Sequence, residues 1–516
     1  MSTTARALIS HNASVELRIT LKIVPKLDLP SQSNPQIFLL LQDSQGSRLI
    51  NHSHNKLGHI ENEPNFSFIL EYRFEELQNI KIVVANGDKS LNLESQGSAP
   101  NEQGLIGEFV TDIGSILGKS KRNLEGDLVL TERSRGQISI SGRELPPKNG
   151  KSLNLKVQGL NLQLPSLAKP DVFYKLSRRI KGNSDINSDV RVLHESERYY
   201  SRNPDWSVIK LSEGDLLNGG SNDEVCFTCW QHKRDGNHKS IGECVLKIDK
   251  LLSSNKVNKV SLTPKGELLL QCASEKTFLG YIAGGLEIRL SIAIDFTSSN
   301  RHYIYGVDLH DISSDETNYG RIIRFIGSVL ESYSTDGQIP VYGFGGKFYG
   351  SGEVSHNFPL NQKNHQPEVF GISGVLEIYK KALENVILLR PSKFAPTIQS
   401  AINRLKSLAD DPKVYEVLLI ITYGMIDDME STIETIMQAS VLPLSIIIIG
   451  VGTADCKELA DFKSYNWGNL NPRDIVQFVA MKDFENQNQI NIDLPKAVLK
   501  KIPSQVMNYM LRKELP

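Results

Sequence analysis

The chain has 516 residues, with 58 basic against 59 acidic side chains and a net charge of −1. Because single domains typically hold roughly 100–200 residues, a chain of this length predicts three or four domains. The balanced charge excludes a global attraction to nucleic acid or to anionic membranes, so any such attraction has to come from local patches. We expect no nucleic-acid partner.

The sequence shows no sign of export or of membrane insertion. Residues 1–6 lack the apolar core of a secretory signal. The longest apolar run, Leu444 to Val451, is far below the roughly 20 residues that span a bilayer. The five cysteines do not read as a disulfide framework in so long a chain, which indicates a reducing compartment. We therefore expect a soluble intracellular protein.

Short β-forming runs separated by turn residues fill the chain up to residue 275. Runs of this kind without long helical periods between them predict antiparallel sandwiches. The turn-rich segment 144–150 divides them into two sets and indicates a linker. Cys226 and Cys229 fall within one run, so their CxxC spacing indicates a strand and not a zinc site. The runs are Val15–Val24, Gln36–Leu41, Phe66–Tyr72, Ile80–Val84 and Gln137–Ser141, then Leu153–Val157, Val172–Leu176, Trp206–Leu211, Glu224–Trp230, Glu243–Ile248 and Glu267–Gln271.

From residue 286 onward the pattern changes to uniformly apolar runs that alternate with helical periods. This alternation predicts an α/β doubly wound, Rossmann-like sheet with helices on both faces. Ligands of such sheets bind at the carboxyl ends of the strands, so the loops after Phe296, Thr422 and Val451 are the expected site. The predicted strands are Leu286–Phe296, Ile339–Phe344, Val417–Thr422, Leu444–Val451 and Ile475–Val479; the helical periods contain Ile322, Phe325, Ile326, Val329 and Leu330, then Val375, Tyr379, Ala382, Leu383 and Val386.

Several motifs along the chain resemble those of the copine family. Asp295-Phe-Thr-Ser-Ser-Asn300 is similar to the copine signature, and further motifs follow the family's order. The resemblance implies two all-β C2 Greek-key sandwiches, residues 1–145 and 150–275, followed by a von Willebrand A-type domain, residues 286–516. It also implies calcium-dependent phospholipid binding and recruitment of protein partners through the A domain. The further motifs are Tyr72–Gln78, Thr277–Gly285, Ile339–Gly346, Val354–Asn361, Phe394–Pro396, Ser445–Gly452, Arg473–Phe478 and Lys501–Val506.

Calcium ligands are depleted in the first domain. By the resemblance, Asp28 and Asp88 keep carboxylates at calcium-loop positions, whereas Asn34, Asn86 and Gly104 stand where the family has aspartates. Because Ca²⁺ affinity depends on the charge count of the ligands, we expect weak calcium binding or none. The alternative is that Asp28 and Asp88 are solvated loop residues without a cation.

No carboxylate remains at the corresponding positions of the second domain. Two ammonium groups about 4 Å apart repel each other by about 4 kcal/mol at an effective dielectric of 20, so a divalent cation should be excluded. The residues at those positions are Gln163, Lys169, Gln231, Lys233 and Lys239.

The same substitutions create a basic surface. Each basic residue near an anionic leaflet contributes about 1 kcal/mol, so this domain is predicted to bind anionic phospholipid without calcium. The alternative is a solvated basic face without a partner. The candidate lipid-binding residues are Lys169, Lys233, Arg234 and Lys239 at the loop tip, with Lys175, Arg178, Arg179 and Lys181 on the following strand and loop.

For the A domain the resemblance implies a metal-dependent adhesion site that holds Mg²⁺ or Mn²⁺. Asp295, Thr297 and Ser299 form its DxTxS run, and Ser392 stands at the position of a second-loop threonine. Tyr423 replaces the aspartate of the TDG motif. One carboxylate with waters can still hold Mg²⁺, so the loss weakens metal binding but does not exclude it. The alternative is that Asp295 bonds to backbone amides and hydroxyls of its own turn.

Neighbouring charges bear on the same site. Lys393 and Arg301 stand beside the predicted ligands and add positive charge, while Asp427 or Asp428 offers a substitute oxygen.

The chain lacks GxSxG and HExxH motifs, and His310 and His356 are isolated from any nucleophile motif, so we expect no enzymatic activity. Two functional hypotheses follow. The first is a cytoplasmic protein that binds the plasma membrane or endomembranes peripherally. The second is a cytosolic scaffold that binds proteins through the A domain while the C2 domains are structural.

Overall fold

The computed structural model of the protein describes residues 12–23, 35–43, 46–54, 65–86, 105–118, 123–146, 152–164, 170–179, 190–217, 224–252, 257–274, 276–302, 307–312, 317–350, 352–363, 366–408, 413–451, 473–484 and 490–514. The chain forms two compact units. Unit 1 combines residues 1–145 with 277–516, and unit 2 consists of residues 146–276. Among the described residues, no helix has both the length and the apolar character that crossing a bilayer requires.

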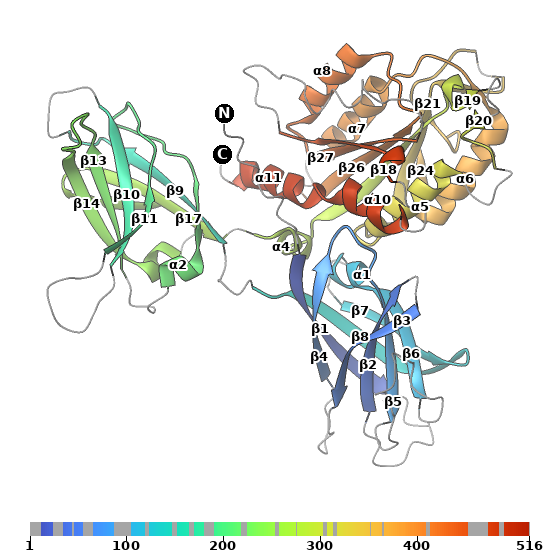
Figure 1. Ribbon diagram of the computed structural model, residues 1–516, viewed down its shortest axis with the longest axis horizontal. Coiled ribbons are helices and arrows are strands. Elements are labelled where there is room, and N and C mark those ends of the chain that lie inside the picture. The colour runs from blue at the N-terminus through green and yellow to red at the C-terminus, as the bar shows by residue number, and fades with distance from the viewer. Residues whose placement is uncertain are drawn as a thin grey trace. The chain divides into compact units, whose positions relative to one another are not determined.

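The first 145 residues form an antiparallel sandwich (Figure 1). Its strand order is β3-β2-β5-β6-β7-β8-β1-β4, and β6 meets β7 at Glu108 and Val129, so the strands divide into two layers. Val15, Leu17 and Ile19 are fully buried at every second position of β1, the period that a half-buried strand requires. The elements are β1 (Asn12–Ile23), β2 (Pro35–Asp43), β3 (Gly46–His54), β4 (Asn65–Arg73), β5 (Asn79–Asn86), β6 (Leu105–Asp112), α1 (Ile113–Gly118), β7 (Asn123–Leu130) and β8 (Arg133–Glu144).

Unit 2 is a second antiparallel sandwich with its own core. Its two sheets have the strand orders β11-β10-β13-β14-β16 and β12-β9-β17-β15. Tyr174, Trp206 and Phe227 are buried in this core, where the rings of Tyr174 and Trp206 lie 4.9 Å apart. The strand predicted from Trp206 begins only at Ile209, because the preceding segment is held by single backbone bonds, such as that from Trp206 to Val157, and not by a continuous ladder. The elements are β9 (Ser152–Leu160), β10 (Val172–Arg179), β11 (Val190–Glu195), β12 (Ile209–Ser212), α2 (Glu213–Leu217), β13 (Glu224–Gln231), β14 (Lys239–Lys247), α3 (Ile248–Leu252), β15 (Asn258–Ser261), β16 (Thr263–Pro264) and β17 (Glu267–Ser274).

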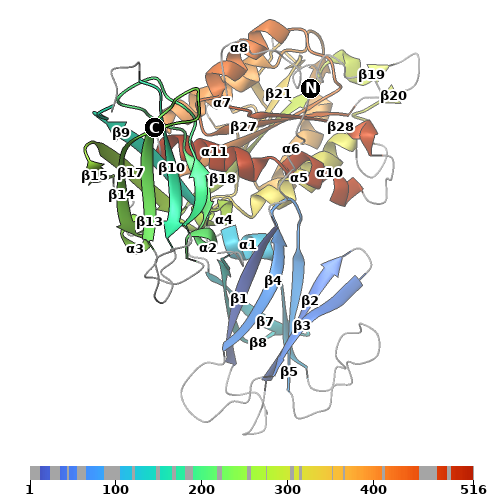
Figure 2. The ribbon, with the colours of Figure 1, turned by 60° about the vertical axis from the view of Figure 1, so that its left-hand side comes forward.

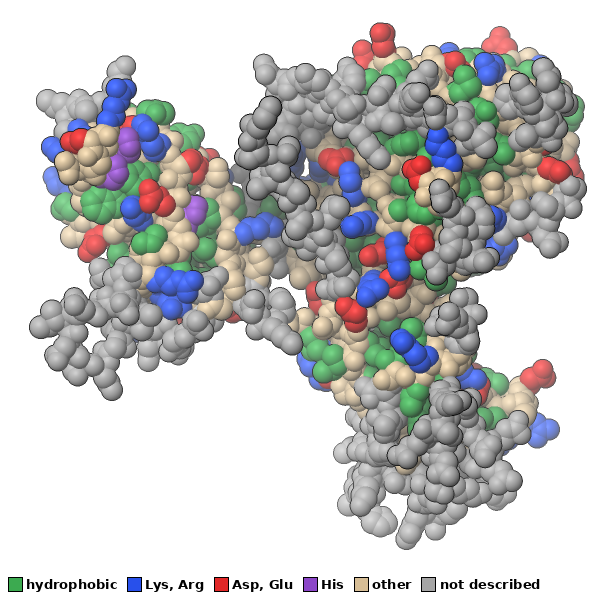
Figure 3. Space-filling model, viewed as in Figure 1, with side chains coloured by type: hydrophobic (Ala, Val, Ile, Leu, Met, Phe, Trp, Pro, Cys, Tyr) green, Lys and Arg blue, Asp and Glu red, His purple; other side chains and the backbone are tan. Residues whose placement is uncertain are grey.

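One face of unit 2 is mixed in charge. On the face that Figure 3 shows, basic, acidic and histidine side chains lie among hydrophobic ones, without a broad field of one sign. Cys226 and Cys229 are both buried in β13, in agreement with the strand prediction for the CxxC run.

The C-terminal part of unit 1 is a parallel sheet covered by helices on both faces (Figures 1 and 2). Its parallel strands have the order β21-β18-β26-β27-β28, and every residue of β26 is buried. Leu418 and Ile420 pack with α7 and α8, whereas Leu419 and Ile421 pack in the core that contains α5, α6 and α10. The predicted doubly wound architecture is confirmed. The strands are β18 (Glu287–Asp295), β21 (Gln338–Phe344), β26 (Val414–Thr422), β27 (Leu444–Gly450) and β28 (Val476–Ala480), with the short β19 (Arg301–His302), β20 (Val307–Asp308), β22 (Gly346–Phe348), β23 (Phe358–Pro359), β24 (Glu368–Phe370) and β25 (Val386–Leu388).

The helices follow the predicted periods closely. Ile322 and Ile326 are buried on α5, whose first turn is capped by the hydroxyl of Thr317. Val386, predicted as the last helical position of the second period, instead begins β25, where it pairs with Phe348. The helices are α4 (Phe278–Ala283), α5 (Asn318–Glu331), α6 (Gly371–Asn385), α7 (Ala395–Ser407), α8 (Met429–Ala439), α10 (Ile490–Leu499) and α11 (Ile502–Glu514).

Within unit 1, an apolar joint connects the first sandwich to the parallel-sheet part. The ring of Phe74, just after β4, lies 4.8 Å from Phe278 of α4 and 5.0 Å from Tyr333. The hydroxyls of Tyr72 and Tyr333 are in hydrogen-bond contact, and both side chains are buried. Two of the motifs quoted above, 72–78 and 277–285, therefore meet at this joint.

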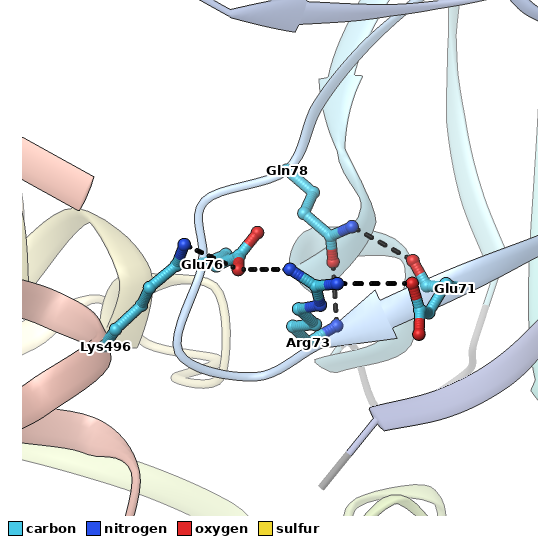
Figure 4. Close-up of polar contacts among 5 residues, drawn as sticks. All are labelled: Glu71, Arg73, Glu76, Gln78 and Lys496. Carbon is cyan, nitrogen blue, oxygen red and sulfur yellow. Dashed lines mark hydrogen bonds and ion pairs between the residues drawn. The ribbon is translucent and has the colours of Figure 1, made fainter. Parts of the chain in front are cut away.

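Polar contacts surround the joint (Figure 4). Lys496 of α10 lies 3.2 Å from Glu76, which also accepts a hydrogen bond from Arg73 at 2.9 Å. Gln78 accepts from the backbone N–H of Arg73 and donates to the carbonyl of Glu71, which closes the loop. Half-exposed ion pairs of this kind contribute at most about 1 kcal/mol each. These ion pairs orient the loop after β4, whereas packing of the buried rings provides most of the stability of the joint.

Replacing Gly118 with alanine should loosen the joint. A methyl group at Gly118 would lie 2.3 Å from the carbonyl oxygen of Ser332, where the end of α1 meets the segment after α5. Overpacking of this kind costs about 1–3 kcal/mol. We expect trypsin to cleave the full chain after Arg73 about tenfold to a hundredfold faster, measured by mass spectrometry. Gly352→Ala, where an added Cβ meets nothing within 4 Å, is the matched control. Equal cleavage rates for both variants would contradict the claim that close packing at Gly118 stabilises the joint.

Candidate functional site

The predicted calcium positions of the first sandwich cannot be placed. Asp28 and Asp88 lie outside the described residues, as do Asn34 and Gly104. Asn86 is the last residue of β5, but its side chain is not among those described. Weak or absent Ca²⁺ binding in this domain stays a prediction.

One end of unit 2 gathers the loops that the resemblance assigns to cation binding. β10 starts and β13 ends there, because Val172 pairs with Gln231. Beyond Gln231, the loop 232–238 leads into β14. Arg234 and Lys239 are exposed and Lys233 is half-buried. Gln231, predicted as a loop residue, is only 1% exposed inside the sandwich. We call loop 232–238 with Lys239 the basic tip.

The other predicted lipid-binding residues differ in their surroundings. Lys175 pairs with Glu195 of the neighbouring strand at 3.0 Å. Arg178 is only 4% exposed, which leaves its guanidinium little surface for a lipid headgroup and disfavours its predicted role. The positions that lie outside the described residues are Lys169, Lys181 and the side chain of Arg179.

The carboxylates near the basic tip are already engaged. The hydrogen bonds from Arg198 hold the pKa of Asp171 below its ordinary value, and His232 lies 3.4 Å from the same carboxylate. Asp235 accepts a hydrogen bond from the backbone N–H of Asn237, which lowers its pKa. In the described ranges, no group of three or more His, Cys, Asp or Glu side chains is placed to hold a metal ion. The tip presents cations, not cation ligands.

In the parallel-sheet part of unit 1, Asp295 ends β18 at the carboxyl edge and is 1% exposed. One of its carboxylate oxygens accepts from the backbone N–H of Thr297 at 2.7 Å. The other accepts from the hydroxyl of Thr422 at 2.7 Å and the N–H of Tyr423 at 3.1 Å. Burial raises the pKa of Asp295, and these hydrogen bonds partly oppose the rise. Only the Thr297 bond lies within its own turn, as the alternative reading expects; the other two donors come from the end of β26.

Three hydroxyls gather near this carboxylate. The hydroxyl of Ser299 accepts a hydrogen bond from Arg390 at 2.7 Å. Thr297 and Ser392 are 1% and 3% exposed, and their hydroxyls find no partner of good geometry among the described residues. The hydroxyl of Thr297 lies close enough to the Asp295 carboxylate to favour its ionised form, although no aligned hydrogen bond results.

Asp427 and Asp428 hold the backbone that carries Ser392. Asp427 accepts from the N–H of Ser392 at 2.7 Å. Asp428 accepts from the N–H groups of Phe394 and Ala395 at 2.9 and 3.0 Å. Both carboxylates thus hold the segment that leads into α7, and none of these bonds supports either of them as a substitute metal ligand.

A buried network of aromatic and polar side chains holds the backbone carbonyl of Asp295. His310 is 2% exposed, and its Nε2 lies 2.9 Å from the carbonyl oxygen of Asp295. Burial lowers the pKa of His310 to about 4, so the ring is neutral near neutral pH. Since a carbonyl only accepts, Nε2 carries the proton and Nδ1 accepts from the hydroxyl of Tyr379 at 2.8 Å. The side-chain amide of Asn300 donates to the same carbonyl, and Tyr319 donates to Asn300.

Comparison with known proteins settles the family. A family model described as Copine matches residues 308–516. Copine-C of Dictyostelium discoideum is 32% identical over 526 residues, which cover 96% of this chain and 94% of that protein. The chain belongs to the copine family. Copine-D of the same organism is also 32% identical, over 96% of each chain.

Solved structures resemble the separate parts of this copine-family chain. The calcium-bound tandem C2 domains of Extended-Synaptotagmin 2 cover 51% of this chain and 95% of that chain, with 14% identity and a TM-score of 0.19. The VWA domain of SpRpn10 covers 40% and 93%, with 14% identity and a TM-score of 0.25. Because these TM-scores are low, the assignment of two sandwiches and an A-type domain depends on the sheet topology described above and not on these structures.

The residues of this copine A domain do not fit a divalent cation. The hydroxyls of Thr297 and Ser392 suit such an ion, but the one nearby carboxylate, that of Asp295, already accepts three hydrogen bonds, and Tyr423 has no carboxylate to add. A Mg²⁺ ion on Ser299 would lie within about 5 Å of the Arg390 guanidinium, and the repulsion would be about 7 kcal/mol at an effective dielectric of 20.

Sequence reasoning missed two parts of this copine site. The positive charge was expected from Lys393 and Arg301, yet Arg301 pairs with Asp308 at 2.8 Å, and Arg390 is the cation that touches a predicted ligand. His310 was noted only as isolated from nucleophiles. Its position before the N-cap Thr317 of α5 gives no sequence signal for a bond to Asp295.

Proposed function

We propose that this copine-family chain is a peripheral membrane protein whose second C2 domain binds anionic phospholipid without calcium. The supporting observation is the basic tip of unit 2. Arg234 and Lys239 are exposed there, while the carboxylates of Asp171 and Asp235 are engaged by donors of the chain itself. A tip of this kind needs no divalent cation to become positive, since its charge is built into the side chains.

Membership of the copine family adds an expected cellular location and an expected role for the A domain to this proposal. The protein works in the cytoplasm and associates with the plasma membrane or endomembranes, and its A domain recruits protein partners. It acts by binding, without catalysing a reaction. Ca²⁺ adds to membrane binding only through the first C2 domain, to the extent that Asp28 and Asp88 hold it.

Vesicle co-sedimentation of the full chain tests the proposal. With EGTA at low salt, we expect the wild type to sediment with phosphatidylserine vesicles and not with phosphatidylcholine vesicles. Lys233→Glu with Lys239→Glu should weaken binding about a hundredfold, because two favourable charges near the leaflet become unfavourable. Raising the salt should weaken wild-type binding as well.

The chain offers a matched control at the far end of β14 and on the helix α3 that follows it. Lys239 begins β14 and Lys247 ends it, so Lys247→Glu with Lys250→Glu reverses two charges at the opposite end of the sandwich. This variant should bind as the wild type does. Absence of wild-type binding in EGTA would leave the scaffold hypothesis in place. Equal losses in both variants would show that the tip is not the contact.

A further inference from the structure

Arg390 occupies a fixed position at the carboxyl edge of the A-type sheet. The residue before it, Leu389, donates its N–H to the carbonyl of Gly345 at 3.0 Å and accepts from the N–H of Ser298 at 2.7 Å. Its guanidinium then donates to the hydroxyl of Ser299 at 2.7 Å and lies 3.7 Å from the sulfur of Met425. Two other loops, through Ser299 and Met425, therefore contact this one side chain.

The Arg390 side chain is exposed, and in the described part of the chain it forms no ion pair with a carboxylate. The acidic groups around it are used elsewhere. Asp295 bonds to Thr297, Thr422 and Tyr423, and Asp427 bonds to the N–H of Ser392. None of these carboxylates is an ion-pair partner of Arg390 in the described part of the chain, so its guanidinium keeps N–H groups for an acceptor from outside the domain.

Further polar groups extend the edge. Burial lowers the pKa of His356, and the charge of the half-buried Lys393 lowers it further. The hydroxyls of Thr297 and Ser392 are buried without a partner among the described residues, and they lie on the same two loops as Ser299 and Arg390. A guanidinium with free N–H groups binds a carboxylate through two parallel hydrogen bonds.

We propose that Arg390 binds an acidic side chain of a protein partner directly, in place of a metal ion. This assignment rests on the proposed recruitment of partners by the A domain and names its chemistry: a carboxylate on an exposed acidic segment. The site is then independent of Mg²⁺ and Mn²⁺, because the positive charge is covalently part of the chain.

An immobilised octaglutamate peptide is the probe, and octaglutamine is its neutral control. We expect the full chain to bind octaglutamate at low salt in EDTA, with no gain from added Mn²⁺. Arg390→Gln should weaken binding at least tenfold, and Arg390→Lys should restore part of it, since an ammonium cannot form the paired bonds. Arg512→Gln, another exposed arginine on α11, should bind as the wild type does.

Two variants separate this proposal from lipid binding. Lys233→Glu with Lys239→Glu should keep the peptide and lose the vesicles, whereas Arg390→Gln should do the reverse. Loss of peptide binding in the tip variant alone would assign the peptide to unit 2 and overturn the proposal. Preference for an octaphosphoserine peptide that Arg390→Gln abolishes, without octaglutamate binding, would overturn the choice of a carboxylate.

Metal titration gives an independent readout. Calorimetry of the wild type with Mn²⁺ should show no binding at the A domain. Arg390→Ala with Tyr423→Asp removes the fixed cation and adds a carboxylate beside the free hydroxyls, so we expect this variant to gain Mn²⁺ binding. Mn²⁺ binding to the wild type that Asp295→Asn removes would overturn the proposal.

Discussion

Replacing Arg473 with alanine is expected to destabilise the A-type domain by about 4 kcal/mol. Arg473 is only 4% exposed and donates to the carbonyls of Ser440, Leu442 and Leu444, as well as to the hydroxyl of Tyr415. Another of its hydrogen bonds reaches the carbonyl of Gln505 in α11. A buried acceptor left without its donor costs about 1–3 kcal/mol, and alanine would leave all of these carbonyls without the donor that Arg473 provides.

Hydrogen exchange of the full chain measures this effect locally. In Arg473→Ala, the amides of β26 and β27 should exchange about a thousandfold faster, because each 1.4 kcal/mol of opening free energy is about tenfold. Strands β10 and β13 of unit 2 serve as the internal control and should not change. Arg512→Ala, an exposed arginine, should leave β26 and β27 as in the wild type. Similar exchange in both variants would contradict the role of Arg473.

The sequence predicts the sheets well because their residues carry the period themselves. Alternating Val15, Leu17 and Ile19 indicate a strand with one buried face, and the uniformly apolar β26 indicates one buried on both. The errors occur where a contact overrides the local pattern. Trp206 leaves the predicted strand while its ring packs on Tyr174, and Val386 leaves the predicted helix to pair with Phe348.

The candidate site shows the same division. The DxTxS spacing places Asp295, Thr297 and Ser299 on one turn, so sequence alone locates them. The bond from Arg390 to Ser299 joins residues 91 positions apart, and nothing in the spacing predicts it. The charge of Arg301, visible beside the motif, is neutralised by Asp308 only after β19 and β20 pair. Proximity in sequence therefore identified the wrong cation.

The buried His310, which bonds to the carbonyl of Asp295, makes the stability of unit 1 depend on pH. In the unfolded chain His310 has a pKa near 6.5, whereas burial lowers it to about 4 in the fold. Between these values the unfolded state holds more protons, so stability rises with pH and is lost as the solution is acidified. From neutral pH to about pH 5 the loss due to His310 is about 2 kcal/mol. The raised pKa of Asp295 has the opposite sign, because its folded state keeps the proton at a higher pH.

His310→Gln isolates the histidine from the carboxylate. The glutamine amide can still donate to the carbonyl of Asp295 but does not titrate. It also lacks the imidazole that stacks on Tyr319 at 4.4 Å, so the variant should be less stable than wild type near neutral pH. By calorimetry, the unit 1 transition of the wild type should lose about 2 kcal/mol more than that of His310→Gln when the pH falls to about 5. His194→Gln in unit 2 should leave the unit 1 transition unchanged. Parallel pH profiles for wild type and His310→Gln would mean that folding leaves the pKa of His310 at its unfolded value, which would contradict a ring kept neutral by burial.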